Sequence, residues 1–134
     1  MAALTSDRNT KRRDGRQLSL PMAASTTIYG GSIVCVNASG YAVPGSTSTG
    51  LKAVGIAQGS ARNSGAAGAE RVSVEKTVAC FANSSADAIT RADLGADCYI
   101  VDDQTVAKTS GSNTRSVAGK VFDVDDDGVW VDFR

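Results

Sequence analysis

The stretch that decides the fold runs from Ile28 to Pro44 and reads IYGGSIVCVNASGYAVP. Its segment Ser32–Val36 is dense in β-branched residues, which favour strands. A turn cluster, Asn37–Gly40, follows it, and Tyr41–Val43 resumes the apolar pattern. Pro44 ends the pattern because proline has no N–H to donate to a β-ladder. The stretch therefore predicts a strand, a turn and a second strand.

Short apolar runs cut by turn residues continue on both sides of this hairpin. Gln17–Met22 alternates between apolar and polar residues and predicts a half-buried strand. Pro21 indicates either that this is an edge strand or that the strand ends at the proline. Leu51–Gln58 is apolar on both faces and predicts a central strand. Arg71–Ala82 keeps one apolar parity but is interrupted at Glu75–Thr77. This segment predicts either a hairpin of two strands or one long bent strand.

The C-terminal third predicts four more strands and one helical turn. Thr90–Asp93 has the shape of a capping box, which indicates a single turn of helix. Asp-Gly between two apolar runs is among the strongest short-range signals for a hairpin, and Asp125–Gly128 stands in that position. The expected strands are Cys98–Val101, Val106–Lys108, Val117–Val124 and Val129–Phe133.

The composition fits a chain of many short strands. The chain has 134 residues, of which 42% are hydrophobic, so it holds the core of one modest domain. Its 14 glycines and 5% aromatic residues suit turns and short strands better than long amphipathic helices. About nine strands at this spacing predict an all-β single-domain sandwich or barrel, jelly-roll-like or related, over residues 17–134. Residues 1–16 lack periodicity and predict an extended N-terminal arm.

The charge is balanced over the chain but not along it. Formal net charge is zero, with 14 basic and 14 acidic residues. The arm, residues 1–16, holds five bases against two acids, a net of +3, and the body holds nine bases against twelve acids, a net of −3. A basic arm on an acidic body is suited to contacting an unlike surface, a neighbouring subunit included. The predicted interface residues of the arm are Arg8, Lys11, Arg12, Arg13 and Arg16.

Trp130 is the remaining candidate for an interface residue. In Val129–Phe133 the alternation sends Val129, Val131 and Phe133 to the core and Trp130 to the opposite face. An outward tryptophan on a terminal strand is a candidate interface anchor. The alternative is a strand buried on both faces of a sandwich.

The residues needed for catalysis or for metal binding are poorly supplied. The chain has no histidine, the commonest general base and metal ligand, and no nucleophile-elbow or phosphate-loop pattern, so we expect neither an enzyme nor a cofactor. Cys35, Cys80 and Cys98 form no C-x-x-C pair and are interpreted as buried apolar residues of a protein made in a reducing cytosol. Asp123–Gly128 matches the first half of a calcium loop, but Arg134 stands where that loop needs a glutamate. We expect a solvated acidic turn there, with a weak divalent-ion site as the alternative.

Direct contact with nucleic acid or with a membrane is not expected. Lys11–Arg13 is a basic run, but no aromatic residues are interleaved with it, as nucleic-acid modules usually require. The N-terminus is charged by residue 7 and lacks the apolar core of a signal peptide. No stretch approaches the roughly 20 apolar residues that span a bilayer.

Several segments resemble one family of virion proteins. They are the hairpin run to Ala57 (IYGGSIVCVNASGYAVPGSTSTGLKAVGIA), ALTSDRNTKRRDG, FANSSADAIT, CYIVDDQTVAKTSG and DDDGVWV. Together they resemble the capsid cement, or head decoration, proteins of tailed bacteriophages and prophages. The chain departs from that family at Glu75–Thr77, where other members have a glycine-containing turn.

The resemblance implies a β-rich body on the outer surface of a phage head, made in the host bacterial cytoplasm. Its implied partners are the major capsid protein and its own copies, as a homo-dimer or homo-trimer that bridges capsomers and stabilises the shell. The family brings no catalytic residues. Two alternatives remain: another virion surface part, such as a head-fibre base or a neck or tail component, and a small β-barrel ligand-binding module. Low aromatic content weighs against a sugar-binding module.

Overall fold

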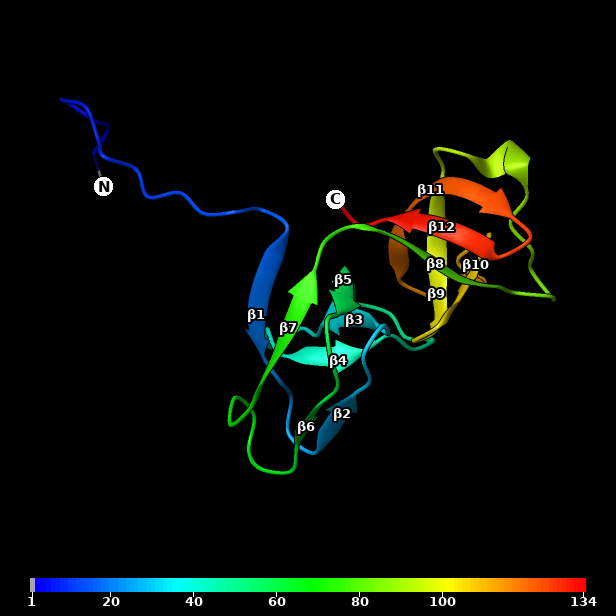
Figure 1. The fold of residues 1–134 in the computed structure, drawn as a ribbon, viewed down its shortest axis with the longest axis horizontal. Coiled ribbons are helices and arrows are strands. Elements are labelled where there is room, and N and C mark those ends of the chain that lie inside the picture. The colour runs from blue at the N-terminus through cyan, green and yellow to red at the C-terminus, as the bar shows by residue number, and fades with distance from the viewer. Residues whose placement is uncertain (1) are drawn as a thin grey trace.

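The computed structural model describes Ala2–Arg134, and Met1, the first residue of the expected arm, lies outside the described residues. The body is all-β and forms a single domain, as the sequence predicts. Figure 1 shows an open sheet in its middle, a barrel on one side of it and a two-stranded ribbon below it. The open sheet has five strands in the order β1 (Gln17–Pro21), β7 (Arg71–Glu75), β5 (Lys52–Ala57), β3 (Ile33–Val36) and β4 (Ala42–Pro44).

The barrel closes five strands from the C-terminal half of the chain. Their order is β10 (Thr105–Ala107), β8 (Val78–Asn83), β12 (Gly128–Asp132), β11 (Val117–Asp125) and β9 (Asp97–Asp102). A parallel pairing of β10 with β8 closes the ring, and all other pairings in it are antiparallel. The ribbon pairs β2 (Thr26–Ile28) with β6 (Ala61–Asn63).

Strand β3, in the middle of the deciding stretch, holds the layers together. Its residues alternate between two cores: Ile33 and Cys35 pack with the barrel residues, and Val34 packs with the residues on the ribbon side. All three are fully buried. A strand that is covered on both faces must be apolar at every position, which explains the uninterrupted run Ile33–Val36. The predicted hairpin is confirmed by the antiparallel pairing of β3 with β4.

Strand β5 confirms the central strand expected at Leu51–Gln58, and a bulge at Val54–Gly55 shifts which of its residues face each core. Ala53 and Ile56 pack toward the barrel, whereas Val54 and Ala57 pack toward the ribbon. The register against β3 shifts between Val34 and Cys35, which pair with Gly55 and Ala53, so Val54 is the additional residue on β5. The φ of Gly55 is +152°, and a Cβ there would collide with the backbone carbonyl of Glu75. Only glycine fits this position.

The break at Glu75–Thr77 is a crossover between the two sheets. β7 pairs with β1 and β5 in the open sheet, whereas β8 pairs with β12 and β10 in the barrel. The hairpin alternative for Arg71–Ala82 is therefore wrong, because β7 and β8 do not pair. The one apolar parity does not continue through the break: Val72 and Val74 point into the ribbon-side core, but in β8 the buried residue is Phe81, of the opposite parity, which points into the barrel core.

Two short elements differ from the sequence-based expectation and one matches it. β2 and β6 are strands that the sequence does not predict. They are three residues long and carry no alternation that a pattern can reveal. The helical turn is a 3₁₀ turn at Arg91–Asp93, and the Thr90 amide donates to the Asp93 carboxylate at 2.8 Å. Within residues 2–134, no helix is long and apolar enough to cross a membrane.

Candidate protein-interaction surfaces

The N-terminal arm lies outside the compact body. Figure 1 shows it running from the start of β1 away from both sheets. Residues 2–16 are exposed, and the bond from the Lys76 amide to the Arg16 carbonyl (2.7 Å) ties the last of them to the body. None of the five predicted arm bases takes part in an ion pair among residues 2–134. The arm therefore presents a net charge of +3 with no partner within the described chain.

Trp130 lies on the outer face of the barrel, and its indole is only partly available. Val129, Val131 and Phe133 are buried, as predicted, with 0%, 0% and 7% of their surface exposed. Trp130 is half-buried, and its Nε1 donates to Oδ2 of Asp125 at 2.9 Å. The strand thus lies between the two alternatives, with one face buried and the other half-buried. Because the indole N–H is already used, Trp130 offers a contact surface but no free donor.

The acidic turn between β11 and β12 is held by its own hydrogen bonds. Oδ1 of Asp125 accepts from the Asp127 amide at 2.9 Å, and Oδ1 of Asp123 accepts from the Val124 amide at 2.8 Å. Both oxygens of Asp125 are thus engaged, one of them by Trp130. Among residues 2–134, no group of three or more cysteine or carboxylate side chains is placed to hold a metal ion.

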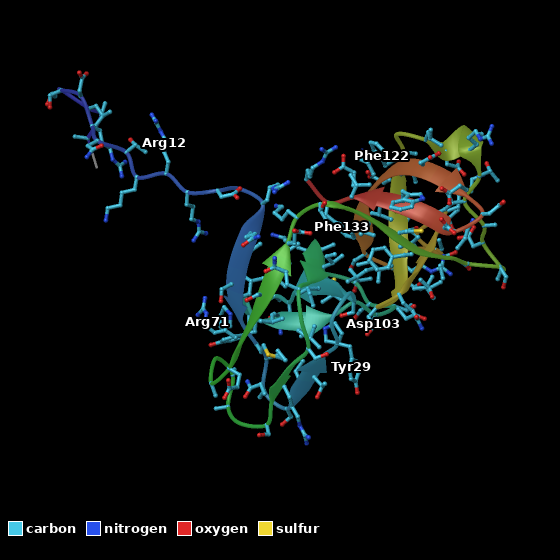
Figure 2. All side chains as sticks on the ribbon, viewed as in Figure 1. Arg12, Tyr29, Arg71, Asp103, Phe122 and Phe133 are labelled. Atoms are coloured by element: carbon cyan, nitrogen blue, oxygen red, sulfur yellow. The ribbon has the colours of Figure 1, made fainter. Side chains whose placement is uncertain are left out.

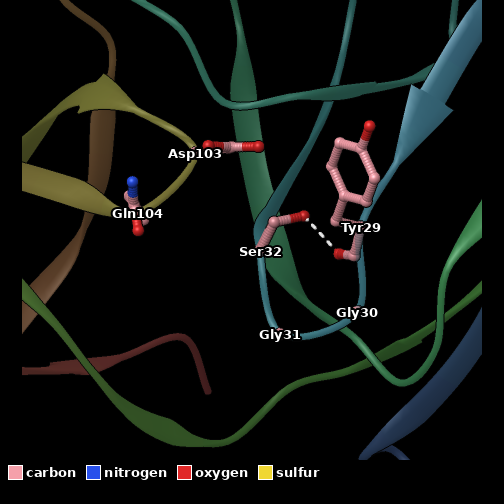
Figure 3. Close-up of a pocket in the computed structure, with 6 residues that line it drawn as sticks. All are labelled: Tyr29, Gly30, Gly31, Ser32, Asp103 and Gln104. Carbon is pink, nitrogen blue, oxygen red and sulfur yellow. Dashed lines mark hydrogen bonds between the residues drawn. The ribbon is translucent and has the colours of Figure 1, made fainter.

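A shallow hollow of about 290 Å³ lies where the open sheet meets the barrel. It is lined by the loop that joins β2 to β3 and by the turn that joins β9 to β10, namely Tyr29, Gly30, Gly31, Ser32, Asp103 and Gln104 (Figure 3). Tyr29 is 64% exposed. Asp103 is half-buried, and its carboxylate accepts no hydrogen bond and forms no ion pair within residues 2–134.

Backbone bonds fix the walls of this hollow. The Ile33 amide donates to the Asp103 carbonyl at 2.9 Å and joins the two walls directly. The Gly31 amide donates to the Ala57 carbonyl at 2.8 Å, and the Ser32 hydroxyl donates to the Tyr29 carbonyl at 2.7 Å. Gly31 has φ of +82°, a conformation that glycine adopts without steric cost. The frame is therefore rigid while the Tyr29 ring and the Asp103 carboxylate remain free.

The sequence reasoning missed three exposed apolar residues. Tyr29 was not predicted as an interface residue, although it follows Ile28, the inward residue of β2, and alternation therefore sends it outward. Phe122 is 54% exposed because it is the additional residue of a bulge, where the register between β11 and β12 shifts. Leu94, 45% exposed, follows the 3₁₀ turn. Period-two alternation locates the first of these, but no sequence pattern locates a bulge.

The free edge of the open sheet at β1 is partly covered. The Arg16 carbonyl accepts from the Lys76 amide, and the Met22 amide donates to the Glu70 carbonyl. In an antiparallel ladder such bonds recur at every second residue, so the odd-numbered residues of β1 point their backbone N–H and C=O groups away from β7. At this outer edge the Arg71 guanidinium donates to the Ser19 carbonyl at 2.8 Å and to the Ser19 hydroxyl at 3.0 Å. Pro21 supplies no N–H. The edge is thus blunted in two places against the addition of a further strand.

The thiols are not poised for nucleophilic chemistry. Burial raises the pKa of Cys35 to about 12, and burial raises that of Cys98 to about 11. Cys80 is half-buried, and burial, followed by the charges of Asp125 and Asp127, raises its pKa as well. Because the thiolate is the nucleophile and the metal ligand, all three remain protonated and unreactive at neutral pH. Cys35 and Cys98 are buried apolar residues as predicted, whereas Cys80 is only half-buried.

Comparison with known proteins gave no relative. No protein-family model matches the chain, and neither a curated protein nor a solved structure shows significant similarity to it.

Proposed function

We propose that this protein is a capsid cement, or head decoration, protein that binds the outer surface of a tailed-bacteriophage head. The observation that carries the proposal is the arm: five exposed bases extend from the body with no ion pair among the described residues. The segments that resemble the cement-protein family supply the identity of the partner. The role is structural and non-enzymatic, and the partners are the major capsid protein and further copies of the chain.

The proposed mechanism is mechanical. The arm docks on one capsid subunit, while the rigid β body packs against its own copies and against the next capsomer. Each contact is modest, but many copies on a closed shell gain avidity because later contacts form at high effective concentration. The body supports this role through its construction, since β3 and β5 contribute to both cores and join the two sheets into one unit.

The experiment that tests the proposal is co-sedimentation with purified heads of the tailed phage or prophage whose genome encodes the chain. The full-length protein should bind heads, and the bound copies should be distributed over the whole shell in electron micrographs. A variant in which the five arm bases are replaced by glutamine should bind at least about tenfold more weakly at low salt, because it loses the unpaired charges. A matched variant with Lys52 and Arg62 replaced by glutamine loses exposed bases from the body only and should bind normally.

The outcomes separate the alternatives. Binding at a single vertex would instead identify a neck, tail or head-fibre component. No binding of the full-length protein to heads contradicts the virion role. Full occupancy by the arm variant contradicts the role of the arm but not that of the body. Light scattering of the free protein should give the mass of a dimer or a trimer.

A further inference from the structure

We propose that the hollow beside Tyr29 is a receptor for an arginine side chain, and that this arginine comes from the N-terminal arm of a second copy of the chain. The inference concerns contacts between copies and does not depend on the proposed virion role. It rests on three features of the described residues: an exposed aromatic ring, a carboxylate without a partner and a set of bases without a partner.

The hollow has the chemistry that binds a guanidinium group. The Tyr29 ring is 64% exposed and offers its face to a cation, an interaction to which arginine is well suited because its planar group also stacks. In Figure 3 Asp103 stands on the wall formed by the β9–β10 turn, and Tyr29 stands on the other wall. The free carboxylate of Asp103 can accept two hydrogen bonds from one guanidinium. Gln104 adds an exposed amide at the rim.

Three backbone carbonyls of the hollow already accept hydrogen bonds within the chain. The carbonyls of Tyr29 and Asp103 already accept the bonds that shape the two walls, and the Gln104 carbonyl accepts from the Ala82 amide at 2.9 Å. The charged and aromatic groups that the hollow offers to a ligand are therefore its side chains. Because those side chains stand on a fixed frame, little ordering opposes binding.

The arm of another copy is the occupant that the charges favour. The arm carries a net of +3 and the body a net of −3. Figure 2 shows Arg12 clear of the body and widely separated from Tyr29, so the arm in its described position does not fill the hollow of its own chain. Arg16 is held at β1 through its carbonyl, which leaves Arg8, Arg12 and Arg13 as the arginines able to reach a neighbour. One arginine is enough to occupy the hollow, and the other bases of the arm remain available to contact the capsid of the proposed function.

The test titrates a peptide of residues 2–16 into a full-length, ¹⁵N-labelled receptor whose Arg8, Lys11, Arg12 and Arg13 are replaced by glutamine, so that its own arm does not compete. We expect the largest amide shifts at Gly30–Ser32 and at Asp103–Gln104. Tyr29→Ala or Asp103→Asn in the receptor should each weaken the peptide about fivefold, the size expected for a partly solvated cation–π contact or ion pair. Asp126→Asn removes one exposed charge from the β11–β12 turn and should leave the affinity within about twofold, because charges there are screened from the hollow.

Four results would overturn the inference. They are the absence of shifts at millimolar peptide, shifts centred on the β11–β12 turn, affinity that is indifferent to Tyr29→Ala and Asp103→Asn, and equal binding of a control peptide in which the bases are glutamine. The ¹⁵N spectra also show whether each receptor variant is folded.

Discussion

The open sheet and the barrel have five strands each, but only the open sheet has free strand edges. The barrel closes through the β10–β8 pairing, so all of its strands have two neighbours. The open sheet ends at β1 and β4, and the arm continues from β1. An unpaired strand edge can pair with a further strand, so the open sheet needs protection that the closed barrel does not. At the β1 edge Arg71 binds the Ser19 carbonyl and Pro21 offers no N–H, and the ribbon covers one face of the sheet.

The difference indicates where interactions concentrate. The arm, the β1 edge and Tyr29 all belong to the open-sheet half, although Asp103 of the barrel completes the hollow. The barrel contributes a closed support, with Phe81 and Phe133 packed edge to face at 5.9 Å between ring centroids.

The largest effect is expected at the glycines where strands approach most closely in each half. Gly55→Ala in the sheet and Gly128→Ala in the barrel put a Cβ against the carbonyls of Glu75 and Phe81, at φ of +152° and +137°. Each should lower the free energy of unfolding by about 3 kcal/mol or more. Gly40→Ala, at φ of +87° with open space around it, is the control and should cost about 1 kcal/mol. Urea unfolding measures all three, and equal losses would contradict the steric argument.

Cavities in the two cores should produce the next largest effect. Ile100→Ala in the barrel core and Ile28→Ala in the ribbon-side core each remove a fully buried side chain and should cost about 3 kcal/mol. Both variants should unfold in one transition, because Ile33 and Val34 on β3 belong to different cores. Calorimetry checks this, and two transitions of which only one shifts would show that sheet and barrel unfold independently.

Asp87 should give the barrel half a specific pH dependence. Hydrogen bonds from the Thr109 hydroxyl and amide, and then from Arg115, lower the pKa of Asp87. The stabilisation is therefore complete above the pKa of the unfolded state and is lost as pH falls through the lower folded value. Asp87→Asn should be less stable than the native chain at pH 7, and the difference should shrink in acid. Urea unfolding at pH 7 and pH 3, with Asp126→Asn as the charge control, measures it; a constant difference would contradict the linkage.

The smallest effect on stability, but a visible effect on association, is expected at the sheet edge. Arg71→Ala uncovers the Ser19 carbonyl and should change the free energy of unfolding by only about 0.5 kcal/mol. Light scattering should nevertheless show additional self-association, because an outward carbonyl of β1 becomes available to another strand. Arg62→Ala removes an exposed base from β6 and is the control. If both variants keep the native mass, Arg71 does not protect the edge.

The sequence by itself determined the β class, most strands, the hairpins at Ile28–Pro44 and Val117–Phe133, the 3₁₀ turn and the extended basic arm. These features depend on local preference: β-branched runs, turn residues and alternation act between near neighbours. The inward and outward faces of the last strand followed from the same alternation, with Trp130 on the outside.

Only the tertiary structure decided which strands share a sheet, because pairing partners that are distant in sequence leave no local pattern. It made Glu75–Thr77 a crossover, placed bulges at Val54 and Phe122, and brought Tyr29 and Asp103, 74 positions apart, to one hollow whose walls are joined by the bond from the Ile33 amide to the Asp103 carbonyl. A hollow between two sheets exists only once both sheets are packed. Its residues therefore have no common signature in the chain.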